Sequence, residues 1–550
     1  MKLPRWSLPA LAFALSVNAQ SNPNAHPNPD PQATLSYIHA AWNTLTRSMT
    51  ECPSLADTKV TTEPILYLPA DVAAPGAVEA VKQQCRVQVR RLPRRITKLG
   101  DVRPQELPAE GLLYLPNPYV VPGGRFNEMY GWDSYFILLG LEADHHEALA
   151  KGIVENFLYE IEHYGGVLNA NRTYYLTRSQ PPFLTSMIRA VVENPASFAD
   201  TDAGKREKQE WLAHAYALAV KDYSTWLRPE HRAGATELAR YFDYGTGPVP
   251  EMADDSTYYL DVIRWLLAHR GEGGDAYLVK GAEKPDAAEA LRLKQASCDV
   301  AQALCLHAWA GGYRLSKDFY LGDRAMRESG YDTSNRFGPF SGSTHHYAPV
   351  CLNSLLYRYE RDMEGFAKEL GKQTDAAIWA QRAQARDAAV HKYLWQAKEG
   401  AFADYDFVRR RPSTYAYVSS LYPLWAGVAT REEAGRTEQT LKVFEWPGGL
   451  SMSNTNSGLQ WDEPYGWAPA NWLATAGLEA NGFHADAVRV AQHFMATVDA
   501  GFAADGTIRE KYNVAAGNAQ VQVSAGYTQN VIGFGWTNAV YLKMRSLTEQ

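Results

Sequence analysis

The sequence predicts an all-α fold, built as one large helical domain or a toroid. Apolar residues recur at intervals of three and four from about Asp133 to the C-terminus, which is the period of amphipathic helices. The apolar and polar alternation that is typical of strands is scarce. With 550 residues, 46% of them hydrophobic and 21% charged, the chain is long enough to bury a large core. These observations leave a toroid and a solenoid as alternatives.

The first twenty residues have the order of a secretory signal peptide. Basic residues in Met1–Trp6 are followed by the apolar run Leu8–Val17 and by the short segment Asn18–Gln20. This order predicts export, with cleavage near residue 20, and the run is too short to remain as a membrane anchor. Residues 21–50 are expected to hold a flexible N-terminus and a first helix. The predicted location is therefore the periplasm or the medium.

Residues 51–115 differ from the rest in their short apolar stretches and frequent prolines, which predicts an extended arm on the helical body. Cys52 and Cys85 in this arm could form a disulfide, but the chain has five cysteines, an odd number, and no pairing is fixed. The basic run Arg86–Arg95 is expected to be solvated or charge-paired surface. Together with its arm, the helical body is predicted to form a single catalytic domain over residues 51–550.

Helices are expected where the three-to-four period is clearest, with clusters of Gly, Pro and Asp between them as loops. No segment has the composition of a hinge between separate domains. The clearest expected helices span Trp211–Leu227, Thr257–His269, Ala287–Ala310, Pro349–Leu370, Ala376–Tyr393 and Gly482–Ala500.

Charge and motif content argue against several classes of function. The formal net charge of -7 disfavours a nucleic-acid partner, because phosphate binding needs clustered Lys and Arg. The cysteines form no C-x-x-C pair, and the pairs His145–His146 and His345–His346 do not complete H-E-x-x-H, so we expect packing or surface histidines and no metal site. A phosphate loop and a dinucleotide fingerprint are both absent, and the sequence implies no cofactor. Oligomeric state is not readable, and a monomer is the default expectation.

Two loop-like segments combine aromatic rings with polar side chains. Residues 122–135 read PGGRFNEMYGWDSY, and residues 460–469 read QWDEPYGWAP. A hexose needs this mixture, because its C–H faces pack on aromatic rings while its hydroxyl rim needs carboxylate, amide and guanidinium partners. These segments predict a sugar-binding site.

Both segments resemble the two signature motifs of the trehalase family almost residue for residue. The resemblance extends from about Pro122 to about Lys543, and the supporting segments follow in the family's order. They are Asn169–Pro182, Glu328–Arg336, Glu510–Tyr512 and Gly533–Asn538. The resemblance implies an (α/α)6 barrel with a sugar pocket in its mouth, a fold that agrees with the helical pattern.

The resemblance further implies an α,α-trehalase that hydrolyses the disaccharide trehalose to two glucose molecules with inversion at the anomeric carbon. By similarity, Asp332 is the general acid and Glu510 the general base. One protonated carboxyl gives its proton to the bridging oxygen while the other, ionised, takes a proton from the attacking water. An inverting pair stands roughly 6.5–9.5 Å apart. Asp332 must hold its proton near the working pH, so we expect apolar or anionic surroundings that raise its pKa.

Residue chemistry alone allows other roles for these side chains. Asp332 is suited to capping a helix or turn, and Glu510 to a surface salt bridge with Arg509 or Lys511. Arg336 is suited equally to substrate binding and to pairing with Asp332 or another carboxylate. The positions that match substrate-binding residues of the family are Arg125, Phe126, Tyr130, Trp132, Asp133, Asn169, Arg178, Gln180, Glu251, Gly330, Trp461, Asp462 and Trp467.

The chain departs from the family's pattern just before Glu251. The family's loop reads Pro-Arg-Pro-Glu, and its arginine contacts sugar, but here Val249 stands at that position. Losing a charged hydrogen-bond partner costs about 1 kcal/mol or more. Either another residue such as Arg336 replaces the missing guanidinium, or the second glucose is held differently.

A second departure follows the general base. Asn513 replaces the family's aspartate, and the glutamate of its lid is missing between residues 514 and 530, where Tyr527 and Gln529 are candidate replacements. These departures keep two alternative functions open. One is an inverting glucosidase for another α-linked disaccharide, prompted by Val249 and the altered lid. The other is a sugar-binding protein with weak turnover, to which the retained carboxylate pair is less suited.

Overall fold

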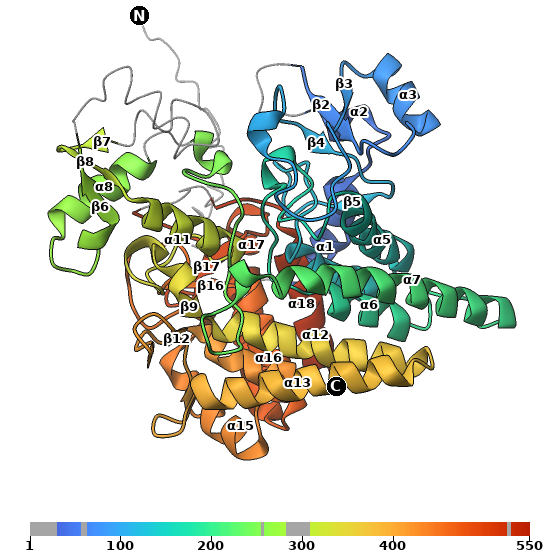
Figure 1. Cartoon of the computed structure of the whole chain (residues 1–550). Coiled ribbons are helices and arrows are strands. Elements are labelled where there is room, and N and C mark those ends of the chain that lie inside the picture. Colours follow the sequence, from blue (N-terminus) through green and yellow to red (C-terminus); the bar gives the residue numbers. More distant parts are fainter. Residues whose placement is uncertain (1–29, 57–62, 255–257, 282–308, 525–529, 550) are drawn as a thin grey trace, which may run out of the picture.

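The computed structural model describes residues 30–56, 63–254, 258–281, 309–524 and 530–549 (Figure 1). The predicted signal peptide, most of the expected helix Ala287–Ala310, and the lid candidates Tyr527 and Gln529 lie outside these residues. The helices are α1 Pro31–Leu45, α2 Cys52–Leu55, α3 Gly76–Gln84, α4 Asp133–Ala143, α5 Glu147–His163, α6 Leu184–Glu193, α7 Asp202–Trp226, α8 Tyr258–Ala268, α11 Lys317–Glu328, α12 Val350–Glu369, α13 Gln373–Tyr393, α14 Tyr422–Ala426, α15 Arg431–Glu438, α16 Ala468–Ala480, α17 His484–Asp505 and α18 Gly535–Thr548.

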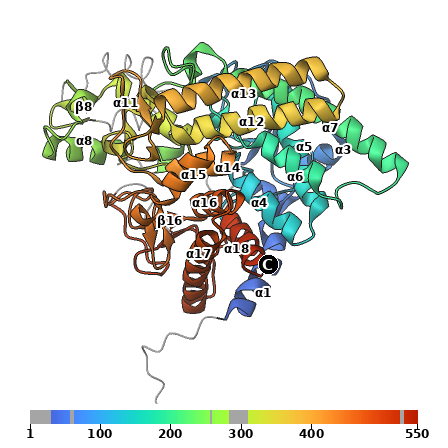
Figure 2. The ribbon, with the colours of Figure 1, turned by 90° about the horizontal axis from the view of Figure 1, so that it is seen from below.

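Six of these helices form a closed inner ring. In the order α4, α6, α12, α14, α16 and α18, each helix contacts the next, and α18 contacts α4 again. Outside the ring, α5, α7, α13, α17 and α1 pack on α4, α6, α12, α16 and α18, and α15 contacts the turn Val418–Leu421 that leads into α14. Figure 2 shows α13 and α17 on the outside of the molecule. The predicted all-α class and (α/α)6 barrel are therefore confirmed.

The burial patterns explain which helices lie inside. The inner helix α4 buries residues around almost its whole circumference, because helices contact it on several sides. The outer helix α13 buries only one stripe, which includes Ala376, Trp379, Ala383 and Val390 at helical spacing. Five expected helices are confirmed, corresponding to α7, α8, α12, α13 and α17.

The N-terminal segment forms a small layer rather than an arm that is extended throughout. Strands β2 Ile65–Leu68, β3 Gln88–Arg91 and β4 Leu112–Leu113 make a parallel sheet in the order β3-β2-β4, with α3 between β2 and β3 (Figure 1). A disulfide joins Cys52 to Cys85 across 33 residues of chain. Two neighbouring parallel strands must be joined by a connection that crosses back along the sheet, and between β2 and β3 this connection contains α3. The segment is therefore not a simple extended arm.

Two arginines of the predicted basic run pair with carboxylates on the surface of this layer. Arg94 Nη1 lies 2.7 Å from Glu106 Oε2, and Arg95 Nε lies 3.3 Å from Asp71 Oδ2. This part of the run is charge-paired, as expected. Among the described helices, none combines the length and the apolar character that crossing a bilayer requires.

The remaining strands form short ribbons between the helices. They are β1 Thr46–Arg47, β5 Tyr119–Val120, β6 Leu278–Lys280, β7 Trp309–Ala310, β8 Tyr313–Leu315, β9 Tyr347–Ala348, β10 Trp395–Gln396, β11 Ala401–Phe402, β12 Tyr405–Asp406, β13 Arg411–Pro412, β14 Glu445–Trp446, β15 Gly449–Leu450, β16 Tyr465–Trp467 and β17 Lys511–Asn513. The antiparallel pair of β16 and β17 places Trp467 opposite Lys511. This ribbon brings the two segments that were singled out in the sequence, 460–467 and 510–513, side by side.

Candidate active site

One cavity of about 350 Å³ collects most of the predicted site residues. A volume of this size suits a small ligand. Its walls come from the loop before α4, the loop 169–180, the segment around Glu251, the end of α11 and the chain next to β17. The predicted residues that line it are Arg125, Phe126, Tyr130, Trp132, Asp133, Asn169, Arg178, Gln180, Glu251, Gly330, Asp332, Trp461 and Glu510.

Two predicted binding residues, Asp462 and Trp467, lie behind the wall instead of in the cavity lining. The Trp467 ring stacks on Trp461 with 3.7 Å between ring centroids, which fixes the face that Trp461 presents to the cavity. Asp462 accepts hydrogen bonds from the Asn335 main-chain N–H and the Tyr415 hydroxyl, both at 2.8 Å. Both residues therefore support the wall.

Asp332 follows the C-terminal end of α11 and turns its carboxyl toward the cavity. Its side chain is 29% exposed. Burial raises the pKa of Asp332 from 3.8 to about 7, although the Arg327 guanidinium opposes this shift. Glu251 is a further cause of the raised pKa. These surroundings agree with those expected for a carboxyl that holds its proton.

A glycine and three tryptophans shape the cavity beside Asp332. Gly330 has a φ of 77°, and a Cβ at this position would lie 2.9 Å from Trp132 Cε2. Both the left-handed backbone and the close contact require glycine here. Trp132 in turn contacts Trp461 and Trp536, with ring centroids 5.9 and 5.7 Å away. The tryptophans form an aromatic wall on which a sugar face can pack.

Glu510 immediately precedes β17 and is almost fully buried, with 3% exposure. Its Oε2 lies 3.1 Å from the Lys511 ammonium nitrogen, and its main-chain carbonyl accepts a hydrogen bond of 3.1 Å from Trp536 Nε1. Asp133, at the start of α4, lines the same part of the cavity. Burial raises the pKa of Asp133 well above 3.8, and the charges of Glu510 and Asp332 add to this effect.

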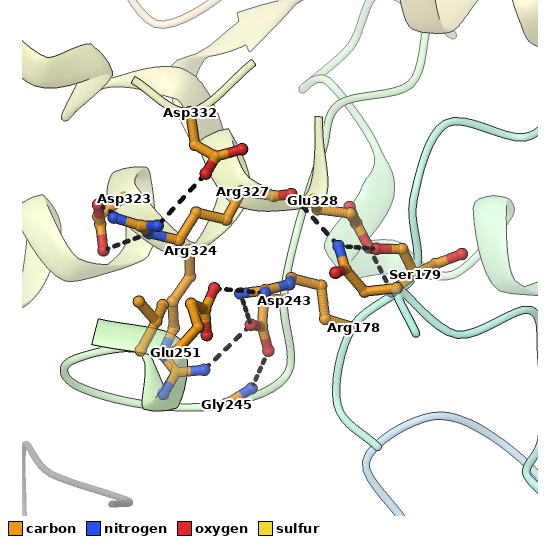
Figure 3. Close-up of polar contacts among 12 residues, drawn as sticks. Arg178, Ser179, Asp243, Gly245, Glu251, Asp323, Arg324, Arg327, Glu328 and Asp332 are labelled. Atoms are coloured by element: carbon orange, nitrogen blue, oxygen red, sulfur yellow. Dashed lines mark hydrogen bonds and ion pairs between the residues drawn. The ribbon is translucent and has the colours of Figure 1, made fainter. Parts of the chain in front are cut away.

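A chain of ion pairs supports the opposite side of the cavity (Figure 3). Arg178 Nη2 lies 2.5 Å from Glu251 Oε1, and its Nη1 lies 3.5 Å from Asp243 Oδ2. Asp243 also pairs with Arg324 at 3.0 Å. In the described chain, Glu251 Oε2 and Arg178 Nε have no hydrogen-bond partner. Both atoms are buried, so the part of these two side chains that lines the cavity is elsewhere.

Arg327 is one of the cavity residues that sequence reasoning missed. Arg336, the candidate replacement for the missing guanidinium, is buried, pairs with Asp404 at 2.7 Å and does not line the cavity. Val249 is fully buried. Arg327 lines the cavity on α11, and its Nη1 lies 3.5 Å from Asp332 Oδ2 (Figure 3). It directly precedes the motif 328–336, and no pattern in the sequence marks it.

The described residues include one group that could hold a metal ion, Asp318, His345 and His346, whose ligand atoms lie within 4.8 Å of one another. His345 Nε2 lies 2.9 Å from Asp318 Oδ1, the distance of an ordinary hydrogen bond. This group does not line the cavity. The site chemistry described above is therefore built from carboxyls, guanidinium groups and aromatic rings.

Comparison with known proteins shows close relatives among fungal enzymes. The chain is 33% identical over 560 residues to the cytosolic neutral trehalase of Saccharomyces cerevisiae, covering 91% of this chain and 69% of the relative. It is 33% identical to a probable trehalase of Eremothecium gossypii, covering 94% and 73%. The solved structure of neutral trehalase Nth1 from Saccharomyces cerevisiae aligns with a TM-score of 0.75 and 30% identity, over 94% of each chain.

The same comparison contradicts the predicted export. The relative from Saccharomyces cerevisiae is named a cytosolic neutral trehalase, and relatives from Beauveria bassiana and Emericella nidulans carry the same name. The order of basic, apolar and small residues in 1–20 is a short pattern that also occurs outside signal peptides, and these residues lie outside the described part of the chain. The predicted secretion and periplasmic location are therefore wrong.

A family model described as Trehalase matches residues 71–264 and 313–548, well over half of the chain. Every predicted site residue falls within these two ranges. The match agrees with the closed ring of helices and with the solved relative of similar fold. The chain therefore belongs to the trehalase family of glycoside hydrolases.

Proposed function

We propose that this protein hydrolyses trehalose to two glucose molecules by a single displacement with inversion, with Asp332 as the general acid and Glu510 as the general base. The observation that carries the proposal is that two carboxyls with different surroundings line one cavity. Asp332 has a pKa raised to about 7, whereas Glu510 lies 3.1 Å from an ammonium group. The names of the relatives from Saccharomyces cerevisiae support trehalose as the substrate.

The two surroundings suit opposite proton transfers. With a pKa of about 7, Asp332 is still protonated in a large share of molecules near neutral pH and can protonate the bridging oxygen as the bond to the first glucose breaks. Glu510, whose Oε2 lies 3.1 Å from the Lys511 ammonium nitrogen, acts in its ionised form and accepts a proton from the attacking water. A division of roles between an acid and a base is what inversion requires.

Sugar recognition would use the aromatic wall and the charged groups opposite it. The tryptophans offer faces to the C–H groups of glucose, and Arg178 and Glu251, whose side chains line the cavity, offer a donor and an acceptor to its hydroxyls. Arg327 supplies a guanidinium group in the cavity although Val249 does not. The case for another α-linked disaccharide is weaker for this reason.

We also propose that residues 51–550 act as one catalytic domain. The small N-terminal sheet joins the cavity wall directly, because the Leu113 N–H donates a 2.8 Å hydrogen bond to the Asn171 carbonyl. The side-chain oxygen of Asn171 in turn accepts a 2.7 Å hydrogen bond from the Met129 N–H. The layer thus supports the loops that carry the predicted sugar contacts.

Purified protein should release glucose from trehalose and leave maltose, kojibiose, nigerose and sucrose intact, with β-glucose appearing first by NMR. Asp332→Asn and Glu510→Gln should each lower kcat by about 10²–10⁴-fold, because each removes one proton transfer. Trehalose binding, followed by tryptophan fluorescence, should survive both changes.

Asp318→Asn is the matched control, since Asp318 lies on the same helix as Arg327 but outside the cavity; its kcat should be unchanged. An α-glucose product, or full turnover by Asp332→Asn, would contradict the proposed mechanism. Preference for another disaccharide would overturn the proposed substrate alone.

A further inference from the structure

A buried bridge connects the two carboxyl-bearing segments behind the cavity wall. Lys511 Nζ lies 3.1 Å from Glu510 Oε2 and donates to Gln460 Oε1 at 3.0 Å. The other end of the same amide, Gln460 Nε2, donates to the main-chain carbonyl of Asp332. Lys511 is fully buried, Gln460 is 1% exposed, and neither lines the cavity. A continuous path of hydrogen bonds therefore runs from the side chain of one carboxyl residue to the backbone of the other.

Rigid neighbours hold both members of the bridge. Lys511 begins β17, opposite Trp467 on β16, and its ammonium lies 5.0 Å from the centre of the Trp467 ring. Trp467 Nε1 donates to the Gln460 carbonyl at 2.8 Å. The next residue, Trp461, donates from its main-chain N–H to the Thr333 carbonyl at 3.0 Å, beside Asp332. The ribbon and its tryptophan thus leave Lys511 and Gln460 little freedom to move.

We propose that Lys511 and Gln460 are positioning residues for hydrolysis: the ammonium pairs with the Glu510 carboxylate and aims it, and the Gln460 amide fixes the Asp332 segment at a set distance from it. This inference rests on the proposed function and deepens it. An ammonium in direct contact favours the charged form of a carboxylate, the form that accepts a proton from water. Inversion also needs a fixed gap between acid and base, which a bridge between their segments provides.

Other charged groups also act on the ion pair of Lys511 and Glu510. Asp133 on α4 brings negative charge toward Glu510, and the charges of Asp332 after α11 and of Arg125 act on Lys511. Burial lowers the pKa of Lys511 from 10.5, while Glu510 and Asp332 oppose this shift. During the reaction, Glu510 takes the proton of water and Asp332 gives its own to the leaving oxygen. Lys511 takes no part in either proton transfer.

Two variants separate the two parts of the bridge. Lys511→Met removes the charge but keeps a long apolar side chain, and the acidic limb of its kcat/KM profile should move up by roughly one to three pH units. Gln460→Met leaves the ion pair in place and cuts the link to Asp332. Its kcat should fall roughly tenfold to a hundredfold, with KM nearly unchanged and the acidic limb where it is in the wild type. Lys511→Arg keeps the positive charge, so the acidic limb of its kcat/KM profile should lie close to the wild-type position.

Arg386→Met is the matched control, because Arg386 is a buried cation that lies 2.8 Å from the Glu360 carboxylate far from the cavity lining. It should lower the melting temperature and leave the acidic limb unmoved. Trehalose binding and thermal unfolding show that each variant is folded. If Lys511→Met does not fold, Lys511→Gln replaces it as the test of the ammonium, and Gln460→Met still tests the link to Asp332.

An unmoved acidic limb in the folded Lys511 variants overturns the electrostatic part of the inference, and unchanged kcat in Gln460→Met overturns the positioning part. Failure of the proposed function gives a different pattern. In that case Asp332→Asn or Glu510→Gln retains full activity, whatever the Lys511 variants do.

Discussion

The proton on Asp332 depends on two opposing influences. Burial raises its pKa to about 7, and Arg327, 3.5 Å away, acts against that rise. Between 3.8, the pKa of an ordinary aspartate, and about 7, the folded chain therefore holds more protons at this site than the unfolded chain does. By linkage, the contribution of Asp332 to the free energy of unfolding decreases as the pH rises through this window. This destabilisation falls at the residue that we propose as the general acid.

Arg327→Met should affect both binding and pH dependence. Removing the guanidinium takes away an influence that lowers the pKa of Asp332, so the alkaline limb of kcat/KM should move above its wild-type position near pH 7. KM for trehalose should rise roughly tenfold or more, because a charged hydrogen-bond donor is lost. Steady-state kinetics from pH 4 to 9 would measure both effects. An alkaline limb at its wild-type position would show that Arg327 does not act on the acid.

Single residues also show where sequence reasoning stops. Trp461 and Asp462 are neighbours in one motif, yet Trp461 lines the cavity and Asp462 supports the wall from behind. Spacing alone cannot tell these sides apart, because the loop that carries them has no regular period. Arg327 was missed although it lies on a regular helix. Arginines are mostly exposed, so nothing in the helical pattern indicates that this one is buried.

At the scale of elements, long periodic helices were predictable and short strands were not. The helix α13 repeats its apolar stripe over 21 residues, so its type and approximate bounds follow from the pattern. The strand β2 has four residues, all buried, and therefore shows no alternation. Its parallel partners lie about twenty and forty residues further along the chain, a pairing that only tertiary structure reveals.

The Cys52–Cys85 disulfide should stabilise this N-terminal layer by restricting its unfolded state. Replacing both cysteines by serine frees a segment of 33 residues, a loss of about 3–4 kcal/mol on chain-entropy grounds. Neither cysteine lines the cavity, so kcat at 25 °C should be kept. Calorimetry and the rate of trypsin cleavage within Arg86–Arg95 would measure the effect. A reductant should reproduce it in the wild type and add nothing in the variant; equal transitions in both proteins would refute the role.

On the scale of the whole molecule, the ring of inner helices closes where α4 meets α18. At Gly140 of α4 a Cβ would lie 2.5 Å from the Cα of Ala539 on α18, closer than atoms of two packed helices can approach. Gly140→Ala should therefore separate the two helices and destabilise the barrel by about 1–3 kcal/mol or more. Because α4 begins at Asp133, activity should fall as well.

Urea unfolding would measure the stability of Gly140→Ala. The control is Gly435→Ala on the outer helix α15, where an added Cβ meets no atom within 4 Å. That control should gain about 0.5–1 kcal/mol through helix propensity alone. Equal stability of the two variants would mean that the contact between α4 and α18 does not close the ring.

The contact between the first and last described helices has a consequence for how the chain is made. The helix α1 packs on α17 and α18, so the part of its surface that these two helices cover has no partner until almost the whole polypeptide has been translated. At about 5–20 residues per second, the ribosome needs roughly 25–100 s to add the intervening chain. Throughout that interval the nascent protein leaves Tyr37 without Phe502 of α17, whose ring centroid lies 5.2 Å from its own in the folded chain. A nascent chain with such unpaired apolar surface is prone to aggregate until its last helices are made.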